Sequence, residues 1–133
     1  GLTPLITRDS TLPLVAVLAS AAERGVAVSD LLANLPGRRT ATDRLKNIPR
    51  EKSLALADTL LAGDHSVLPD GVGQLTSTDT TDGVRMTFSS GRIVTVRPSG
   101  NAPELRCYVE AEDQAAADAL LADALGRLQR ALE

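Results

Sequence analysis

Two arginines, Arg97 and Arg106, lie at the two ends of a short polar segment rich in turn residues. Residues 93–96 before it and 107–109 after it are largely β-branched or aromatic, so they predict two short strands joined as a hairpin. Strand alternation places both arginines on the same face as Tyr108, and pairing of the strands would bring the two guanidinium groups together. A guanidinium presents a planar fork of donors that matches phosphate oxygens. The spacing indicates a phosphate-binding site, although an ordinary turn with two solvated arginines also fits it.

The segment between the arginines can add further hydrogen-bond donors to such a site. Ser99 offers a hydroxyl group, and the backbone N–H groups around Gly100 can form an anion-binding concavity. Each charge-assisted hydrogen bond contributes roughly 1.5 to 3 kcal/mol, so four or five of them would make a phosphate-bearing ligand the favoured occupant.

Residues 97–111 closely resemble the phosphate-binding signature of the α-D-phosphohexomutases, the phosphomannomutases and phosphoglucomutases. That signature runs Arg-Pro-Ser-Gly-Thr-Glu-Pro-Lys, then an aliphatic residue, Arg, an aliphatic residue and Tyr, and it lies in the fourth and last domain. This chain departs from it at Asn101 for Thr, Ala102 for Glu and Glu104 for Lys. Asn101 can still donate through its amide, whereas Glu104 adds a negative charge near the proposed anion. The variant is most similar to an actinobacterial type of phosphomannomutase.

The resemblance implies an isomerase of carbohydrate metabolism that interconverts hexose 6-phosphate and hexose 1-phosphate through a bisphosphorylated sugar, with a phosphorylated serine and Mg²⁺. The family's phosphoserine, metal and sugar-recognition loops have no counterpart in these residues. We therefore expect a fragment that is inactive alone, with no catalytic or metal-binding residue and with Mg²⁺ bound outside it. Its partners would be a phosphorylated hexose and the other domains of the parent enzyme. The substrate phosphate would be held by Arg97, Ser99, Gly100, Asn101 and Arg106.

The resemblance extends upstream of the hairpin. Arg8-Asp9-Ser10 before an apolar helical pattern, and residues 28–36, resemble the segment that leads from the third domain of the family into the fourth. We therefore expect residues 1–36 to be a helical segment from the end of the third domain and residues 37–133 to be the C-terminal phosphate-binding domain. Residues 37–46, which are polar and basic, are expected to be a linker that can act as a hinge or become an edge strand.

The hydrophobic pattern predicts an α+β fold. Helices are expected over residues 9–24, from Ser29 to before Pro36, from Pro49 to Gly63 and after Asp113, with a meander of strands over residues 71–111. The result would be a four-stranded, mainly antiparallel sheet with two helices on one face, like the TATA-box-binding protein, preceded by the helical leader. The other face would be polar and open. The predicted core comprises Val84, Met86, Phe88, Val94, Val96, Leu105, Cys107, Val109, Leu121, Leu125, Leu128 and Leu132.

Length and composition restrict the function classes. The 133 residues fit one domain plus a leader, and the net charge of −3 gives no broad attraction for nucleic acid. Phe88 and Tyr108 are the only aromatic residues, too few for base stacking. The single cysteine, Cys107, on the core side of a strand, predicts a buried thiol and a reducing cytoplasm. With no signal peptide and no apolar run of roughly 20 residues, we expect a soluble cytoplasmic protein without membrane contact.

Other residues that could do chemistry have structural explanations. His65 has no second metal ligand near it in sequence and fits a solvated loop, and Asp79 and Asp82 fit turn formers better than an acid/base pair. Residues 38–52 contain a basic cluster, which could bind a phosphorylated ligand, contact another domain of the parent enzyme or form a solvated face. The cluster comprises Arg38, Arg39, Arg44, Lys46, Arg50 and Lys52. A different functional class also remains open, namely a free-standing regulatory module whose open sheet face binds another protein.

Overall fold

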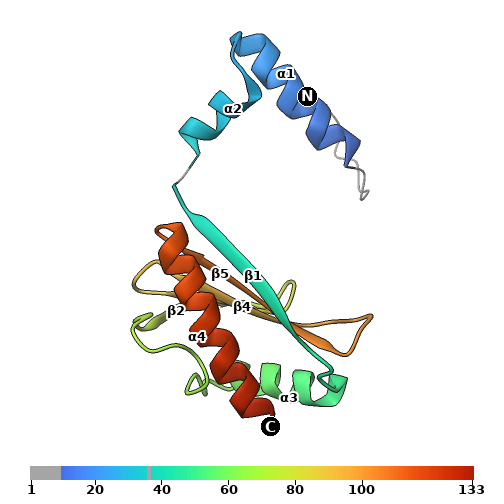
Figure 1. Cartoon of the computed structure of the whole chain (residues 1–133), viewed down its shortest axis with the longest axis vertical. Helices are drawn as coiled ribbons and strands as arrows, with labels where there is room; N and C mark the ends of the chain where they lie inside the picture. The colour runs from blue at the N-terminus through green and yellow to red at the C-terminus, as the bar shows by residue number, and fades with distance from the viewer. Residues whose placement is uncertain (1–9, 36) are drawn as a thin grey trace. The chain divides into compact units, whose positions relative to one another are not determined.

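The computed structural model describes residues 10–35 and 37–133, and the chain divides after residue 36 into two compact units (Figure 1). In the first unit, α1 (Thr11–Arg24) ends at Gly25, whose positive φ of 64° turns the chain so that the N–H of Val26 donates to the carbonyl oxygen of Ala21 at 3.1 Å. Then follow α2 (Val28–Leu31) and a 3₁₀ turn, η1 (Leu32–Asn34). The predicted features at Arg8, Asp9 and Pro36 lie outside the described residues.

The second unit, Gly37–Glu133, contains one antiparallel sheet with the strand order β1-β5-β4-β3-β2. Its strands are β1 (Arg39–Lys46), β2 (Leu75–Asp79), β3 (Val84–Phe88), β4 (Ile93–Pro98) and β5 (Glu104–Ala111). Helices α3 (Arg50–Leu61) and α4 (Gln114–Leu132) pack against the sheet from the same side (Figure 1). The predicted α+β class with two covering helices is confirmed.

The sheet has one strand more than the four that were predicted. The additional strand, β1, lies in the segment predicted to be a linker that can become an edge strand, and it pairs with β5 over the full length of that strand. Only Ala41 and Leu45 of β1 contact the core, so its sequence lacks a strong apolar alternation. Pairing with β1 supplies hydrogen-bond partners to the edge of β5, which would otherwise stay unsatisfied. The predicted hinge over residues 37–46 is wrong for residues 39–46, because these form a paired strand, and the alternative of an edge strand is confirmed.

The core lies between the sheet and its two helices. Alternate residues of β3, β4 and β5 are buried toward the helices, as predicted, and the most enclosed include Met86, Val94, Val96, Leu105, Cys107 and Val109. In α4 the buried stripe differs from the prediction. Leu121 and Leu125 are only partly buried, and the fully covered positions are Ala117, Leu120, Ala124, Leu128 and Leu132. The small alanines allow α4 to approach the sheet closely, so they occupy the centre of the contact.

Candidate phosphate-binding site

The hairpin of β4 and β5 places Arg97 directly opposite Arg106. Residues opposite each other in an antiparallel pair share a face, so both side chains start from the open face of the sheet, where residues 99–103 connect the strands. The loop is closed at its base by the N–H of Ser99, which donates to the backbone oxygen of Glu104 at 3.0 Å. The structure therefore places the backbone positions of the two predicted arginines opposite each other at the neck of the loop.

The loop residues are arranged as a buried base and an exposed tip. Ser99 is only 8% exposed, and its Oγ accepts a hydrogen bond from the N–H of Asn101 at 3.4 Å, so this hydroxyl oxygen serves the loop itself. Gly100 and Asn101 are exposed. A Cβ built on Gly100 would meet nothing within 4 Å, so the space above its backbone is open. An anion could therefore approach the backbone at Gly100 without steric conflict.

Arg106 is engaged by a neighbouring carboxylate. Its Nε and Nη2 donate to Oε1 of Glu104 at 2.9 and 2.7 Å, and Nη1 of Arg44 lies 3.3 Å from the other oxygen of the same carboxylate. The hydrogen bonds from Arg106 hold the pKa of Glu104 below its ordinary value, and the positive charges of Arg44 and Lys46 act in the same direction. The carboxylate in turn raises the pKa of the Arg106 guanidinium.

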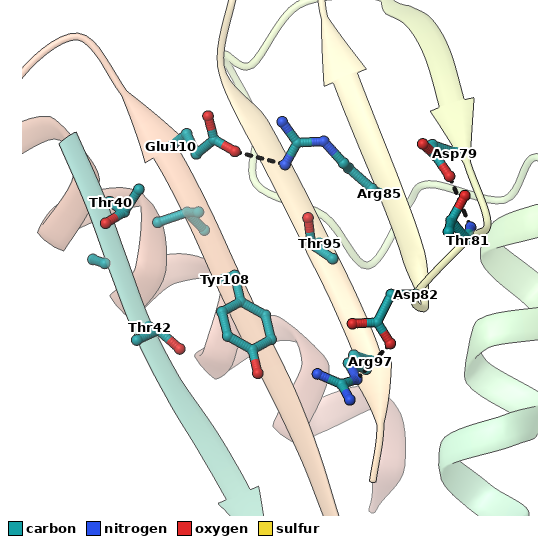
Figure 2. Close-up of a pocket in the computed structure, with 12 residues that line it drawn as sticks. Thr40, Thr42, Asp79, Thr81, Asp82, Arg85, Thr95, Arg97, Tyr108 and Glu110 are labelled. Carbon is teal, nitrogen blue, oxygen red and sulfur yellow. Dashed lines mark hydrogen bonds and ion pairs between the residues drawn. The ribbon is translucent and has the colours of Figure 1, made fainter. Parts of the chain in front are cut away.

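Arg97 has a different counter-ion, on the turn between β2 and β3. Its Nε lies 3.0 Å from Oδ1 of Asp82 (Figure 2). The next residue, Gly83, has a φ of 93°, and a Cβ there would lie 2.8 Å from the carbonyl oxygen of Val96 and 3.0 Å from Cβ of Arg97. Glycine is therefore required for this turn to pack against β4 at the arginine. Asp82 is a turn residue, as predicted, and it also pairs with Arg97, which the sequence pattern did not indicate.

The corner between β1 and α3 supports the loop from the other side. The N–H of Ile48 donates to the carbonyl oxygen of Pro103 at 3.0 Å, and Nη1 of Arg50 donates to the carbonyl oxygen of Ser99 at 3.3 Å. Asn47, at this corner, adopts a left-handed φ of 58°. Sequence reasoning placed Arg50 only in a basic cluster, because no local spacing links it to a loop 49 residues away.

Beside Arg97 the open face holds a concavity of about 470 Å³. Figure 2 shows Thr95, Arg97 and Tyr108 on neighbouring strands, with Thr40 and Thr42 on the adjoining β1. Arg85 crosses this face to Glu110, with Nη1 2.6 Å from Oε1. The face is therefore polar and hydroxyl-rich, as predicted for the side of the sheet that the helices leave open.

Comparison with known proteins identifies the family. The model of the phosphoglucomutase/phosphomannomutase C-terminal domain matches residues 14–126. The chain belongs to this family. It is 43% identical to a phosphomannomutase of Sinorhizobium fredii (strain NBRC 101917 / NGR234) over 134 residues, which cover 99% of this chain and 28% of that protein. It is 38% identical to a phosphomannomutase of Salmonella muenchen over 114 residues, covering 83% of this chain and 23% of that relative. The chain thus spans about a quarter of the length of these curated relatives.

Within this phosphohexomutase domain the basic residues 38–52 do not form one patch. Arg38 reaches the carbonyl oxygen of Gly91 and the carboxylate of Glu110, and Lys52 donates to the carbonyl oxygen of Leu132 near the C-terminus. Arg44 and Arg50, by contrast, contact the residues at the neck of the loop. The cluster read from the sequence is therefore divided among three places.

The remaining candidates lie away from the arginine pair or have structural roles. His65 lies in the loop after α3, and hydrogen bonds from the side chain and the backbone N–H of Thr81 lower the pKa of Asp79. Met86 and Cys107 are fully buried, as predicted. In residues 10–35 and 37–133, no three potential ligands among His, Cys, Asp and Glu lie close enough to hold a metal ion. None of the helices in these ranges has the length and apolar character that a membrane span requires.

Proposed function

We propose that this domain binds the substrate phosphate that is not being transferred in a phosphomannomutase or phosphoglucomutase. The observation that supports the proposal is the register of β4 and β5, which sets Arg97 opposite Arg106 at the neck of an exposed loop. The ligand site would comprise Arg97, Ser99, Gly100, Asn101 and Arg106. Guanidinium forks and backbone N–H groups together match the oxygens of a tetrahedral anion.

The contribution of such a domain to the reaction would be positioning. A phosphate held at this loop fixes one end of a sugar, so the other end can be presented to the reacting groups in a restricted orientation. The hydrogen bonds from Ile48 and Arg50 to the loop carbonyls favour this role. They order the loop before the ligand arrives and so reduce the entropy that binding would otherwise lose.

The bond-making chemistry would come from other domains of the parent enzyme. There, a phosphorylated serine and Mg²⁺ would interconvert the 6-phosphate and 1-phosphate of a hexose through a bisphosphorylated sugar, in the cytoplasm. This domain alone would be inactive, and its partners would be the hexose phosphate and those other domains.

A titration followed by NMR tests the proposal on the chain as it is. Adding mannose 1-phosphate, and separately inorganic phosphate, should shift the backbone amide signals of residues 99–102 and 104–106. Arg97→Ala and Arg106→Ala should each weaken binding by at least about tenfold, since each removes charge-assisted hydrogen bonds of roughly 1.5 to 3 kcal/mol. Arg130→Ala, on the exposed end of α4, removes the same charge from the side of the sheet opposite the arginine pair and serves as the control.

Two results would contradict the proposal. One is the absence of amide shifts at millimolar ligand, which would favour the protein-interaction module instead. The other is an equal loss of affinity in the Arg130 variant, which would mean that net charge rather than the loop attracts the ligand. In the parent enzyme, the Arg97 and Arg106 variants should raise KM for the sugar phosphate.

A further inference from the structure

Arg106 does not present a free fork to a ligand. Its Nε and Nη2, the donors that a phosphate would take side-on, both point to Oε1 of Glu104. A phosphate at the neck of the loop would therefore compete with a carboxylate that is already part of the protein.

Glu104 is the most enclosed of the carboxylates that form ion pairs in the described residues. Its side chain is 9% exposed, whereas that of Asp82, the counter-ion of Arg97, is 70% exposed. Glu104 also lies between two cations, Arg44 and Arg106. Asp82 can turn into solvent when a ligand approaches Arg97, but a carboxylate covered by protein and paired on both sides cannot leave in the same way.

We propose that Glu104 sets the affinity and the charge preference of the phosphate site by holding Arg106 as a resident counter-ion. This inference rests on the proposed function of the loop. An incoming phosphate must share Arg106 with Glu104 and accept a negative charge at close range, because like charges that share a site repel each other. The repulsion scales with the charge of the ligand, so it weakens binding of a phosphate dianion more than binding of a monoanion of the same shape.

The position of Glu104 in the sequence strengthens the inference. Glu104 begins β5 and Arg106 follows two residues later, so both side chains lie on the same face of one strand. The backbone oxygen of Glu104 also accepts the hydrogen bond that closes the loop. The carboxylate is therefore fixed to the base of the loop, and its charge lies within reach of any anion bound there.

The test measures the affinities of two ligands that have the same shape but different charges, for the unchanged chain and for two variants. Methyl phosphate carries about two negative charges near pH 8, and methyl sulfate carries one. Glu104→Gln keeps a side chain that can accept from Arg106 but removes the charge. We expect it to tighten methyl phosphate binding by about tenfold and methyl sulfate binding by about threefold. The repulsion energy from Glu104 is half as large for the singly charged ligand, so the fold-change in its affinity is the square root of that for the doubly charged ligand.

Glu112→Gln is the matched control. It removes one carboxylate charge from another arginine pair, with Arg92, just beyond the opposite end of β5, roughly 25 Å along the strand. Its affinities for both ligands should equal those of the unchanged chain. Shifts of the backbone amide signals of residues 99–102 report binding in every variant.

A measurement on the unchanged chain keeps the test decisive if Glu104→Gln does not fold. The Nε–H signal of Arg106 and the carboxyl carbon signal of Glu104 should move during the methyl phosphate titration with the same Kd as the loop amides. Two results would overturn the inference and leave the proposed phosphate site intact. In one, the loop amide signals shift while the Arg106 and Glu104 signals do not. In the other, the Glu104→Gln variant binds both ligands with the affinities of the unchanged chain. No loop shifts in any variant would overturn the proposed function together with the inference.

Discussion

Gly83→Ala is the substitution that most directly tests the geometry around Arg97. Gly83 has a φ of 93°, a conformation that costs an L-residue about 1 to 2 kcal/mol. The added methyl group would also lie 2.8 Å from the carbonyl oxygen of Val96 and 3.0 Å from Cβ of Arg97. Because these are atoms of a strand rather than the end of a flexible side chain, the turn or the strand must shift.

The chain contains a matched control for this substitution. Gly63 has a φ of 94°, and a Cβ there would meet nothing within 4 Å. Gly63→Ala therefore has the backbone strain without the steric conflict. We expect it to lower the free energy of unfolding by about 1 to 2 kcal/mol, and Gly83→Ala to lower it by a further 1 to 3 kcal/mol, roughly the range for overpacking.

Urea denaturation of both variants, followed by circular dichroism, measures the two effects. In thermal unfolding each kcal/mol corresponds to about 4 to 8 °C for a domain of this size. Gly83→Ala should also weaken phosphate binding, because the displaced strand carries Arg97, whereas Gly63→Ala should not. Equal losses of stability in the two variants would refute the close packing of the turn against β4.

Two further predictions concern the loop and the pH dependence of stability. Gly100→Ala should leave stability unchanged or slightly higher, since Gly100 has neither a positive φ nor a close neighbour; it should weaken phosphate binding by NMR titration if the anion lies over this backbone, and unaltered binding would exclude that position. Hydrogen bonds from Arg92 lower the pKa of Glu112 to about 2, and those from Arg106 lower the pKa of Glu104, from an ordinary value of 4.5. Their stabilising effect is present above that value and is lost as the pH falls toward about 2, so the urea midpoint should decrease over this window, and Glu112→Gln should make the decrease shallower.

The sequence was sufficient to predict that Arg97 and Arg106 occupy opposite positions on one face of two paired strands. Apolar residues alternate in the segments that became β4 and β5, and a short loop between two such strands permits few registers. The side of the sheet that each residue faces then follows from its position along the strand, because successive residues face opposite sides. The opposition of Arg97 and Arg106 is a direct consequence, and so is the burial of Cys107.

The partners of the arginines could not be predicted, because they depend on contacts that no local pattern encodes. Asp82 reaches Arg97 only because the turn after β2 packs on β4, and Arg50 reaches the loop from the start of α3. The strand β1 could be predicted only as one alternative for a polar linker, since only two of its eight residues contact the core. An edge strand of this kind is determined by the neighbour that it pairs with rather than by its own hydrophobic pattern.

The unequal burial of the two counter-ions gives the proposed site a defined order of engagement. Arg97 would exchange the exposed Asp82 for a phosphate at little loss, because both states leave that carboxylate in water. Arg106 would join only by sharing its donors with the enclosed Glu104. Arg97 and the backbone at the loop tip would therefore capture the ligand, and Arg106 would adjust its affinity. It follows that Arg97→Ala should remove more binding than Arg106→Ala, and that this difference should shrink once Glu104 is neutral.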